Sequence, residues 1–358
     1  MRAFSRYRPS TTPPRDCTLA VKHAGFKGSD TGLGVVPKPS PILLDYDAAA
    51  GEPKLLTNLS AAAVAGNFLW TGSDEGRTVE CLEPHGAGYR LKQQFSLDAL
   101  FRGLPGRATR DEVDVESISI GDGMLWIAGS HCHVRLNRKD RTKVDPRFRS
   151  RPSRCLLGAV KLTPDGGDIV GRGAALPYDG PGSLRDRLRA DPYIAPFIDL
   201  PSKENGLDIE GLCAVDSRLF LGLRGPVVDS IAIAVELQLG RTGSVMRQRP
   251  VLHFLDLGGL GIRDLTRKGR DLLVMAGPVS VANAPFRLFR WRPKRSAHIE
   301  RPELLMEWTG LDEHPEGIAI LKRDNRKGLL MLLDSPDLKR IAGKRYRADW
   351  VPFSRFGL

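Results

Sequence analysis

The chain has 358 residues, of which 41% are hydrophobic, and a formal net charge of +12. This length allows two ordinary domains or one large all-β domain, and the positive charge favours anionic partners. The five cysteines are scattered without a CxxC pair, which excludes a disulfide framework and indicates a reducing compartment. The sequence has no run of about 20 apolar residues for a membrane helix and no signal-peptide pattern near residue 1. We therefore expect a cytoplasmic protein without a membrane contact.

Residues 1–16 are rich in proline, serine, threonine and arginine, which predicts a disordered basic tail. Short apolar strands separated by Gly, Asp and Asn turns follow, so residues 17–358 are predicted to form a single all-β domain. Helical patterns are rare. Short helices are expected at Ser96–Phe101 and Ser183–Ala190.

Five segments share one pattern, in which a polar or acidic residue leads an apolar strand and a turn connects it to a second strand. They begin at Leu59, Asp114, Asp208, Ile262 and His314. The leading positions, aligned as Ser60, Glu116, Glu210, Asp264 and Glu316, are 56, 94, 54 and 52 residues apart. A period near 50 with four short strands per unit predicts a β-propeller. We predict five blades, with insertions at about 133–154 and 178–194 filling the long gap; six blades is the alternative.

Closure of the ring needs strands from the start of the domain. The last repeat begins at His314 and leaves only 45 residues, fewer than one period. Segments 41–47 and 53–58 are therefore expected to add its outer strands, which would remove exposed sheet edges.

In a propeller, the starts of the first strands and the ends of the second strands lie at one face near the axis. The sequence therefore predicts a ring of charged side chains around one mouth of the central channel. The strand starts supply Asp114, Glu116, Asp208, Glu210, Arg263, Asp264 and Glu316. The strand ends supply Asp74, Glu75, Ser130, His131, Arg224, Asp334 and Asp337. Acidic residues fit strand propensity and burial poorly, although each one could instead bond the backbone of a connecting turn.

This ring predicts a metal-assisted hydrolase of an anionic small molecule, either a phosphoester or a lactone. Carboxylates suit a hard divalent cation such as Ca²⁺, which could polarise the substrate and activate water. The expected metal ligands are Asp114, Glu116, Asp208, Glu210, Asp264 and Glu316. The expected catalytic residues are Glu116, Glu210 and His131, the last as an acid–base group near neutral pH. The expected substrate-binding arginines are Arg154, Arg224 and Arg263.

Other functions are also compatible with the sequence. The propeller could be a non-catalytic binding module for an acidic protein partner. The basic segment 135–154 could contact nucleic acid, although it offers only Phe148 for stacking, or it could form a cationic lid over the channel or a solvated loop. Two histidines flank Cys132, but a zinc site would need further ligands. GxSxG, HExxH and Rossmann glycine patterns are absent from the sequence.

Several of these motifs resemble a bacterial family known as domain-of-unknown-function family 3616. The segments that carry the resemblance are SAAAVAGNFLWTGSDEG, DVESISIGDGMLWIAGSH, RPSR, NGLDIEGL, LFLGLRGP, GLGIRDL, LLVMAGP and RLFRW, in that order over about residues 57–335. The resemblance implies a propeller-like domain and supplies no activity. The DxEG repeats are also similar to phytase-like and esterase-like propellers, which implies calcium and a phosphoester. Asn58 and Ser73 replace acidic residues of the family pattern, which puts a metal site near them in doubt.

Overall fold

A computed structural model describes most of the unit Gly34–Leu358. The described residues are 39–47, 55–106, 111–136, 146–240, 244–280, 284–294, 298–309, 313–334 and 336–358. The predicted tail 1–16 and the middle of the basic segment, 137–145, lie outside these residues.

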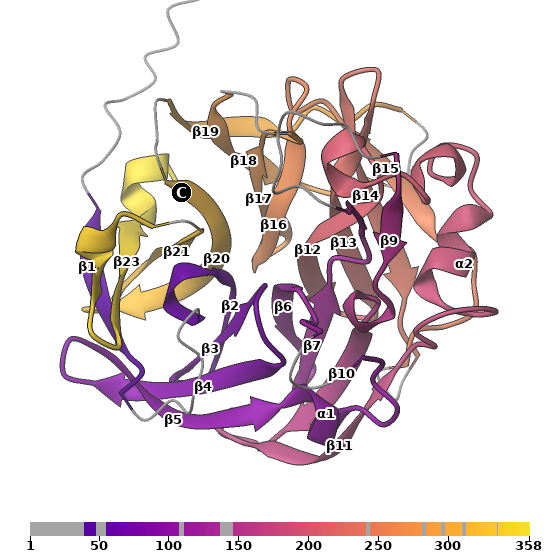
Figure 1. Ribbon diagram of the computed structural model, residues 1–358. Coiled ribbons are helices and arrows are strands. Elements are labelled where there is room, and N and C mark those ends of the chain that lie inside the picture. Colours follow the sequence, from indigo (N-terminus) through magenta and orange to yellow (C-terminus); the bar gives the residue numbers. More distant parts are fainter. Residues whose placement is uncertain are drawn as a thin grey trace, which may run out of the picture. The chain divides into compact units, whose positions relative to one another are not determined.

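Three antiparallel sheets have four strands each, ordered from the middle of the unit outward (Figure 1). The first contains β6 (Val115–Gly121), β7 (Met124–Gly129), β10 (Leu157–Leu162) and β11 (Ile169–Ala175). The second contains β12 (Asp208–Val215), β13 (Arg218–Val228), β14 (Ile231–Gln238) and β15 (Val251–Leu255). The third contains β16 (Gly261–Lys268), β17 (Asp271–Gly277), β18 (Phe286–Trp291) and β19 (Glu303–Trp308).

The remaining large sheet joins the two ends of this unit. Its strands are, in spatial order, β2 (Leu59–Ala65), β3 (Phe68–Ser73), β4 (Thr78–His85), β5 (Gly88–Ser96), β1 (Ser40–Asp45), β23 (Arg345–Pro352), β21 (Arg326–Asp334) and β20 (His314–Arg323), with β22 (Ile341–Ala342) beside β23. Strand β1 pairs antiparallel with β23 and parallel with β5. The predicted closure by segment 41–47 is thus confirmed. Segment 53–58 adds no strand in its described part, because Leu55–Thr57 forms the 3₁₀ helix η1.

The first strands of the five repeats are β2, β6, β12, β16 and β20. They form a closed ring, in which each contacts the next and β20 contacts β2. The fold is therefore an all-β propeller, as predicted. The blade count stays a prediction, since the runs β2–β5 and β1–β23–β21–β20 are hydrogen-bonded into one sheet.

Helical segments are short and lie in the connections. The α-helices are α1 (Leu97–Leu100) and α2 (Leu184–Arg189), within the two predicted helices. The 3₁₀ helices after η1 are η2 (Pro152–Arg154), η3 (Ala195–Phe197), η4 (Ser202–Glu204), η5 (Leu338–Arg340) and η6 (Phe353–Phe356). Segment 133–154 also holds the hairpin of β8 (His133–Arg135) and β9 (Phe148–Ser150). Among the described residues, no helix is long and apolar enough to cross a membrane.

Apolar side chains from adjacent sheets pack into the core between them. Trp70, Phe220 and Trp291 are completely or almost completely buried there, as large aromatic residues of a packed interior are expected to be. The start of β16 also approaches the neighbouring strand β13 closely. A Cβ atom on Gly261 would lie 2.1 Å from the backbone oxygen of Arg224, so only glycine fits where β16 begins beside β13.

A buried histidine links two carboxylates at the outer side of the second sheet. Nδ1 of His253 lies 3.0 Å from Oε1 of Glu300, and its Nε2 lies 3.2 Å from Oε2 of Glu236. Burial lowers the pKa of His253, but the hydrogen bonds and charges of the two glutamates outweigh this effect and raise it above its ordinary value. The protonated imidazolium therefore bridges the two acids.

We expect His253→Gln to lower the free energy of unfolding by about 2 kcal/mol at pH 6, because hydrogen bonds to charged groups contribute about 1.5–3 kcal/mol. Stabilisation from a raised histidine pKa is complete below the unfolded value, near 6.5, and is lost as the pH rises through the folded value. The difference between wild type and variant should therefore shrink from pH 6 to pH 9 in urea unfolding. The exposed His85→Gln is the control, and a difference that grows with pH would contradict the bridge.

Candidate functional site

Each first strand of the ring carries one extra residue near its start. In β6 the register shifts between Val115 and Ser117, so Glu116 stands outside the regular ladder. The residues at the equivalent bulges are Ser60 on β2, Glu210 on β12, Arg263 on β16, and Glu316 with Gly317 on β20. A β-bulge re-aims a side chain and is common beside active sites. The alignment of Asp264 with Glu116 is therefore wrong, because Arg263 holds that position.

A cavity of about 440 Å³ opens at the strand starts, where most of these bulges lie. Its charged walls come from strand starts, strand ends and the connection before β12. The acidic lining residues are Asp74, Asp114, Glu116, Glu204, Asp208, Glu210, Glu316 and Asp334. The other polar or ionisable lining residues are Arg135, Arg154, Arg224, Lys203, Ser202, His133 and Cys132. Part of the predicted ring thus lines one cavity. The predicted ring residues outside its lining are Glu75, Ser130, His131, Arg263, Asp264 and Asp337.

Three arginines are engaged by the carboxylates of the ring. Arg154 lies 2.6 Å from both Glu112 and Asp114. Arg224 contacts Asp208 and lies 2.6 Å from Oε1 of Glu210.

Arg263 extends the network across the ring. Its Nε lies 3.0 Å from Oε2 of Glu210, and its other end contacts Glu316. This one guanidinium therefore joins β12, β16 and β20, and the three predicted substrate-binding arginines are used to neutralise buried acids.

A second group of acids has no such partner. Among the described residues, no ion pair or side-chain hydrogen bond reaches the carboxyl groups of Asp74, Glu116 or Asp334. Burial, together with the charges of Asp114, Glu210, Asp74 and Asp208, raises the pKa of Glu116 well above its ordinary value. Burial and the charges of Asp114 and Asp334 raise the pKa of Asp74 to about 8. Asp74 therefore holds its proton near pH 7, and the raised pKa of Glu116 favours its neutral form in the same way.

Two of the arginine-bound acids, Glu210 and Asp114, have pKa values below that of Asp74. Burial raises the pKa of Glu210 to about 7, against the opposing charges of Arg224 and Arg263. Burial raises that of Asp114 to about 6, against the charge of Arg154 and a hydrogen bond from Ser130. The cavity thus brings together carboxyl groups with different pKa values, which is the pattern of acid–base pairs in enzymes.

Two further observations mark this region as a place for a ligand. Oδ1 of Asp208 is buried and has no hydrogen-bond donor among the described residues, so a water or a ligand hydroxyl is expected to donate to it. Asp114 and His131 have left-handed backbones, with φ of 59° and 55°. Such strain in residues other than glycine clusters at functional sites.

Two predicted residues point away from the cavity. Nε2 of His131 lies 3.1 Å from the backbone oxygen of Leu156, and burial lowers the pKa of His131 to about 3. Its imidazole is therefore neutral at pH 7 and does not line the cavity. Asp264 accepts hydrogen bonds from Ser117 and from the backbone N–H of Ile318, both at 2.8 Å, and ties β16 to β6 and β20.

The predicted metal ligands do not gather as a set. Asp114, Asp208, Glu210 and Glu316 each face an arginine, and Asp264 is turned into the ring. Among the described residues, no group of three or more His, Cys, Asp or Glu side chains is arranged to hold a metal ion. In this arrangement the arginines occupy the carboxylates that a calcium ion would need. The cofactor stays a prediction.

Some lining residues were not predicted from the sequence. Glu204 on η4 pairs with Arg135 on β8 at 2.5 Å, and the hydroxyl of Ser202 accepts a hydrogen bond from Arg224 at the cavity wall. Both residues lie in the connection before β12. The only indication of a functional role in the sequence is that this connection precedes Asp208. Arg135 is the first residue of the basic segment, so that segment begins at the cavity, as a lid would. Cys132 also lines the cavity, but burial raises the pKa of its thiol to about 12, so it is no thiolate nucleophile.

Comparisons place the chain beside known proteins. A family model described as a protein of unknown function (DUF3616) matches residues 58–348, and a search of curated protein sequences found no match. The chain is similar to a GH43_1 enzyme from Xanthomonas citri, with 11% identity over 83% of this chain and 87% of that chain and a TM-score of 0.46. It is also similar to glutaminyl cyclase from Myxococcus xanthus, with 10% identity over 88% and 100% and a TM-score of 0.41. The similar structures include enzymes of different chemistry, so they assign none to this chain.

Proposed function

Because the chain belongs to the DUF3616 family of proteins of unknown function, its activity has to be inferred from its cavity, and we propose that this cavity is the active site of a hydrolase acting on a small lactone. The observation that carries the proposal is that Glu116, which has no cationic partner among the described residues, lines the same cavity as arginine-bound Asp208 and Glu210. One group can give a proton and the others can take one at the same pH.

The charge of the cavity favours a lactone over a phosphoester. Arg154 and Arg224 are already bound to carboxylates, while Asp74, Glu116 and Asp334 have no cationic partner among the described residues. A phosphate dianion would have to displace a buried carboxylate from its arginine or lie against unpaired acids, and both are costly. A neutral ester has no negative charge, so neither cost arises when it binds.

The roles of the residues follow from their protonation. A water that donates to Oδ1 of Asp208 is deprotonated as its oxygen attacks the ester carbonyl carbon. Arg224, on the cavity wall, keeps its contacts with Asp208 and Glu210, and its positive charge stabilises the negative charge that develops on the carbonyl oxygen. As the ring C–O bond breaks, Glu116 gives its proton to the leaving oxygen. The product is a hydroxy acid, and the proton held by Asp208 returns to Glu116 through solvent.

A panel of five- and six-membered lactones and aryl phosphates tests the proposal with purified protein at pH 7. We expect lactone turnover that falls about 10²- to 10³-fold in Asp208→Asn, within the range for a general base. The control Asp216→Asn changes an exposed acid in the β12–β13 turn and should keep full activity. Phosphate turnover without lactone turnover would contradict the substrate class. Turnover of neither would leave the binding-module hypothesis, and repeating the assay with EDTA and then with Ca²⁺ tests the predicted cofactor.

A further inference from the structure

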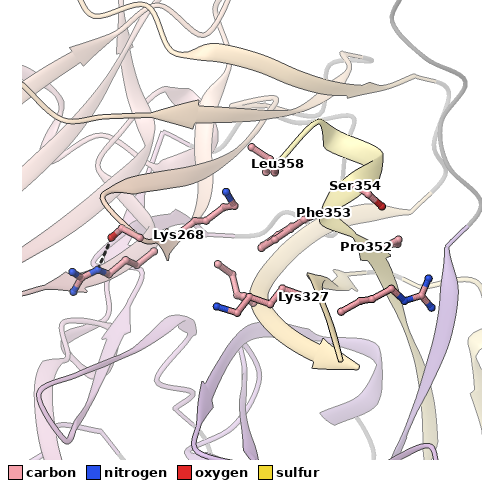
Figure 2. Close-up of a pocket in the computed structure, with 10 residues that line it drawn as sticks. Lys268, Lys327, Pro352, Phe353, Ser354 and Leu358 are labelled. Carbon is pink, nitrogen blue, oxygen red and sulfur yellow. Dashed lines mark hydrogen bonds between the residues drawn. The ribbon is translucent and has the colours of Figure 1, made fainter. Parts of the chain in front are cut away.

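A second cavity, of about 610 Å³, lies at the other ends of the first strands (Figure 2). It is bounded by the β16–β17 turn, the β20–β21 hairpin and η6. Lys268 ends β16, whereas Arg263 stands near the start of that strand in the charged ring. The two cavities therefore lie at opposite ends of the same strands.

This cavity has an apolar floor and a cationic rim. Phe353 belongs to a buried core cluster, and the partly buried Ile320 and Leu358 pack against that cluster. In Figure 2, the side chains of Lys268, Phe353 and Leu358 lie around the opening. The rim cations are Arg267, Lys268, Arg326 and Lys327. Among the described residues of this lining, no side chain is acidic, in contrast to the charged ring.

Most rim cations are not neutralised within the described part of the chain. Arg267 pairs with Asp216 at 3.0 Å, but no carboxylate pairs with Lys268, Arg326 or Lys327 there. Lys268 lies 5.4 Å from the ring centroid of Phe353, and Arg326 lies 5.9 Å from that of Trp350. Stacking on aromatic rings orders these cations without removing their charge.

The end of the β20–β21 hairpin adds an unfavourable pairing. Lys322 stands directly opposite Lys327, and Arg323 stands directly opposite Arg326. Like charges in directly opposed positions of antiparallel strands destabilise the pair. Arg323 lies 3.7 Å from Asp324, but no carboxylate among the described residues pairs with Lys322 or Lys327, so that pair favours an external anion.

We propose that this cavity binds a small organic anion, with its anionic group on Lys268 and Lys327 and an aromatic body over Phe353 and Ile320. The volume lies in the range of small-molecule sites, and an apolar floor with a few charged groups fixes the orientation of such a ligand. The proposal concerns a site apart from the charged ring, and it holds whether or not the ring is catalytic.

Naphthalene-2-sulfonate is a suitable probe because it has an aromatic body and a sulfonate that no hydrolase step consumes. Calorimetric titration of the full chain should show binding to the wild type, at least tenfold weaker binding of inorganic sulfate, and none of naphthalene-2-methanol. Lys327→Glu should weaken naphthalene-2-sulfonate binding at least tenfold. The unliganded variant should melt at the same or a higher temperature, since Lys322 then faces an opposite charge.

Two controls separate this site from others. Lys339→Glu makes the same charge change on a side chain that is 91% exposed and should bind as the wild type does. Glu116→Gln, in the charged ring, should also leave binding unchanged. Absence of binding to the wild type, or equal binding by Lys327→Glu and wild type, would overturn the proposal.

Discussion

Glu116→Gln is expected to lower lactone hydrolysis about 10²- to 10⁴-fold, the contribution of a positioned general acid. The loss should be in kcat, because the amide keeps the shape of the neutral carboxyl group but has no proton to give. Folding should not suffer. Burial raises the pKa of Glu116, so its stabilisation is present at low pH and is lost as the pH rises through the folded value. The variant should therefore match wild-type stability at pH 4 and exceed it by a margin that grows as the pH rises above the unfolded value, near 4.5.

Glu80→Gln provides a matched control for this substitution. Glu80 is fully buried on β4, bonded to Thr78 at 2.6 Å, and does not line the cavity. Activity of this variant should equal that of the wild type. Equal activity of Glu116→Gln and wild type on every lactone turned over would remove Glu116 from the mechanism, whatever the stability data show.

Arg263→Met is expected to lower the free energy of unfolding by about 3–5 kcal/mol at pH 8. Methionine fills similar space, but Glu210 and Glu316 then lose the cation between them, and removing one partner of a buried ion pair costs about this much. The loss should shrink toward pH 5. Glu210 has a raised pKa of about 7, so protonation at lower pH relieves the uncompensated charge.

Urea unfolding of Arg263→Met at several pH values measures this effect, with Arg301→Met as control. Arg301 is 85% exposed and lies 3.7 Å from Asp256, and exposed pairs contribute only about 0–1 kcal/mol. A loss for Arg263→Met that stays constant between pH 5 and pH 8 would mean that packing, and not charge, sets its contribution.

The fold could be predicted because its signals are local and periodic. An acidic or polar residue before each apolar strand recurs every 52 to 56 residues, apart from one gap of 94, and the strands repeat the same alternation of apolar residues and turns. The cavity followed from the same signals, since strand starts meet near the axis. Asp114, Glu116, Asp208 and Glu210 lie where the pattern predicted them.

What could not be predicted depends on single-residue register. The bulge in β16 gives Arg263 the position of Glu116 and turns Asp264 toward Ser117, and a sequence pattern cannot tell which of two adjacent residues stands outside the ladder. Ion pairing could not be predicted from the sequence either. Arg154 follows Asp114 by 40 residues, and nothing in the spacing says that it neutralises an acid instead of binding substrate.

The position of β1 also sets the order in which the chain can fold. Arg345 on β23 donates to Asp45 on β1 at 3.0 Å, across 300 residues of chain, so this pairing has the highest sequence separation in the ring and the largest loop-closure entropy. During synthesis, β1 leaves the ribosome long before β23 exists. We therefore expect the three four-stranded sheets to form first and the ring to close only after β23 is made. Until then β1 and β21, the two partners of β23, present open strand edges, which is where a stalled or truncated nascent chain would aggregate.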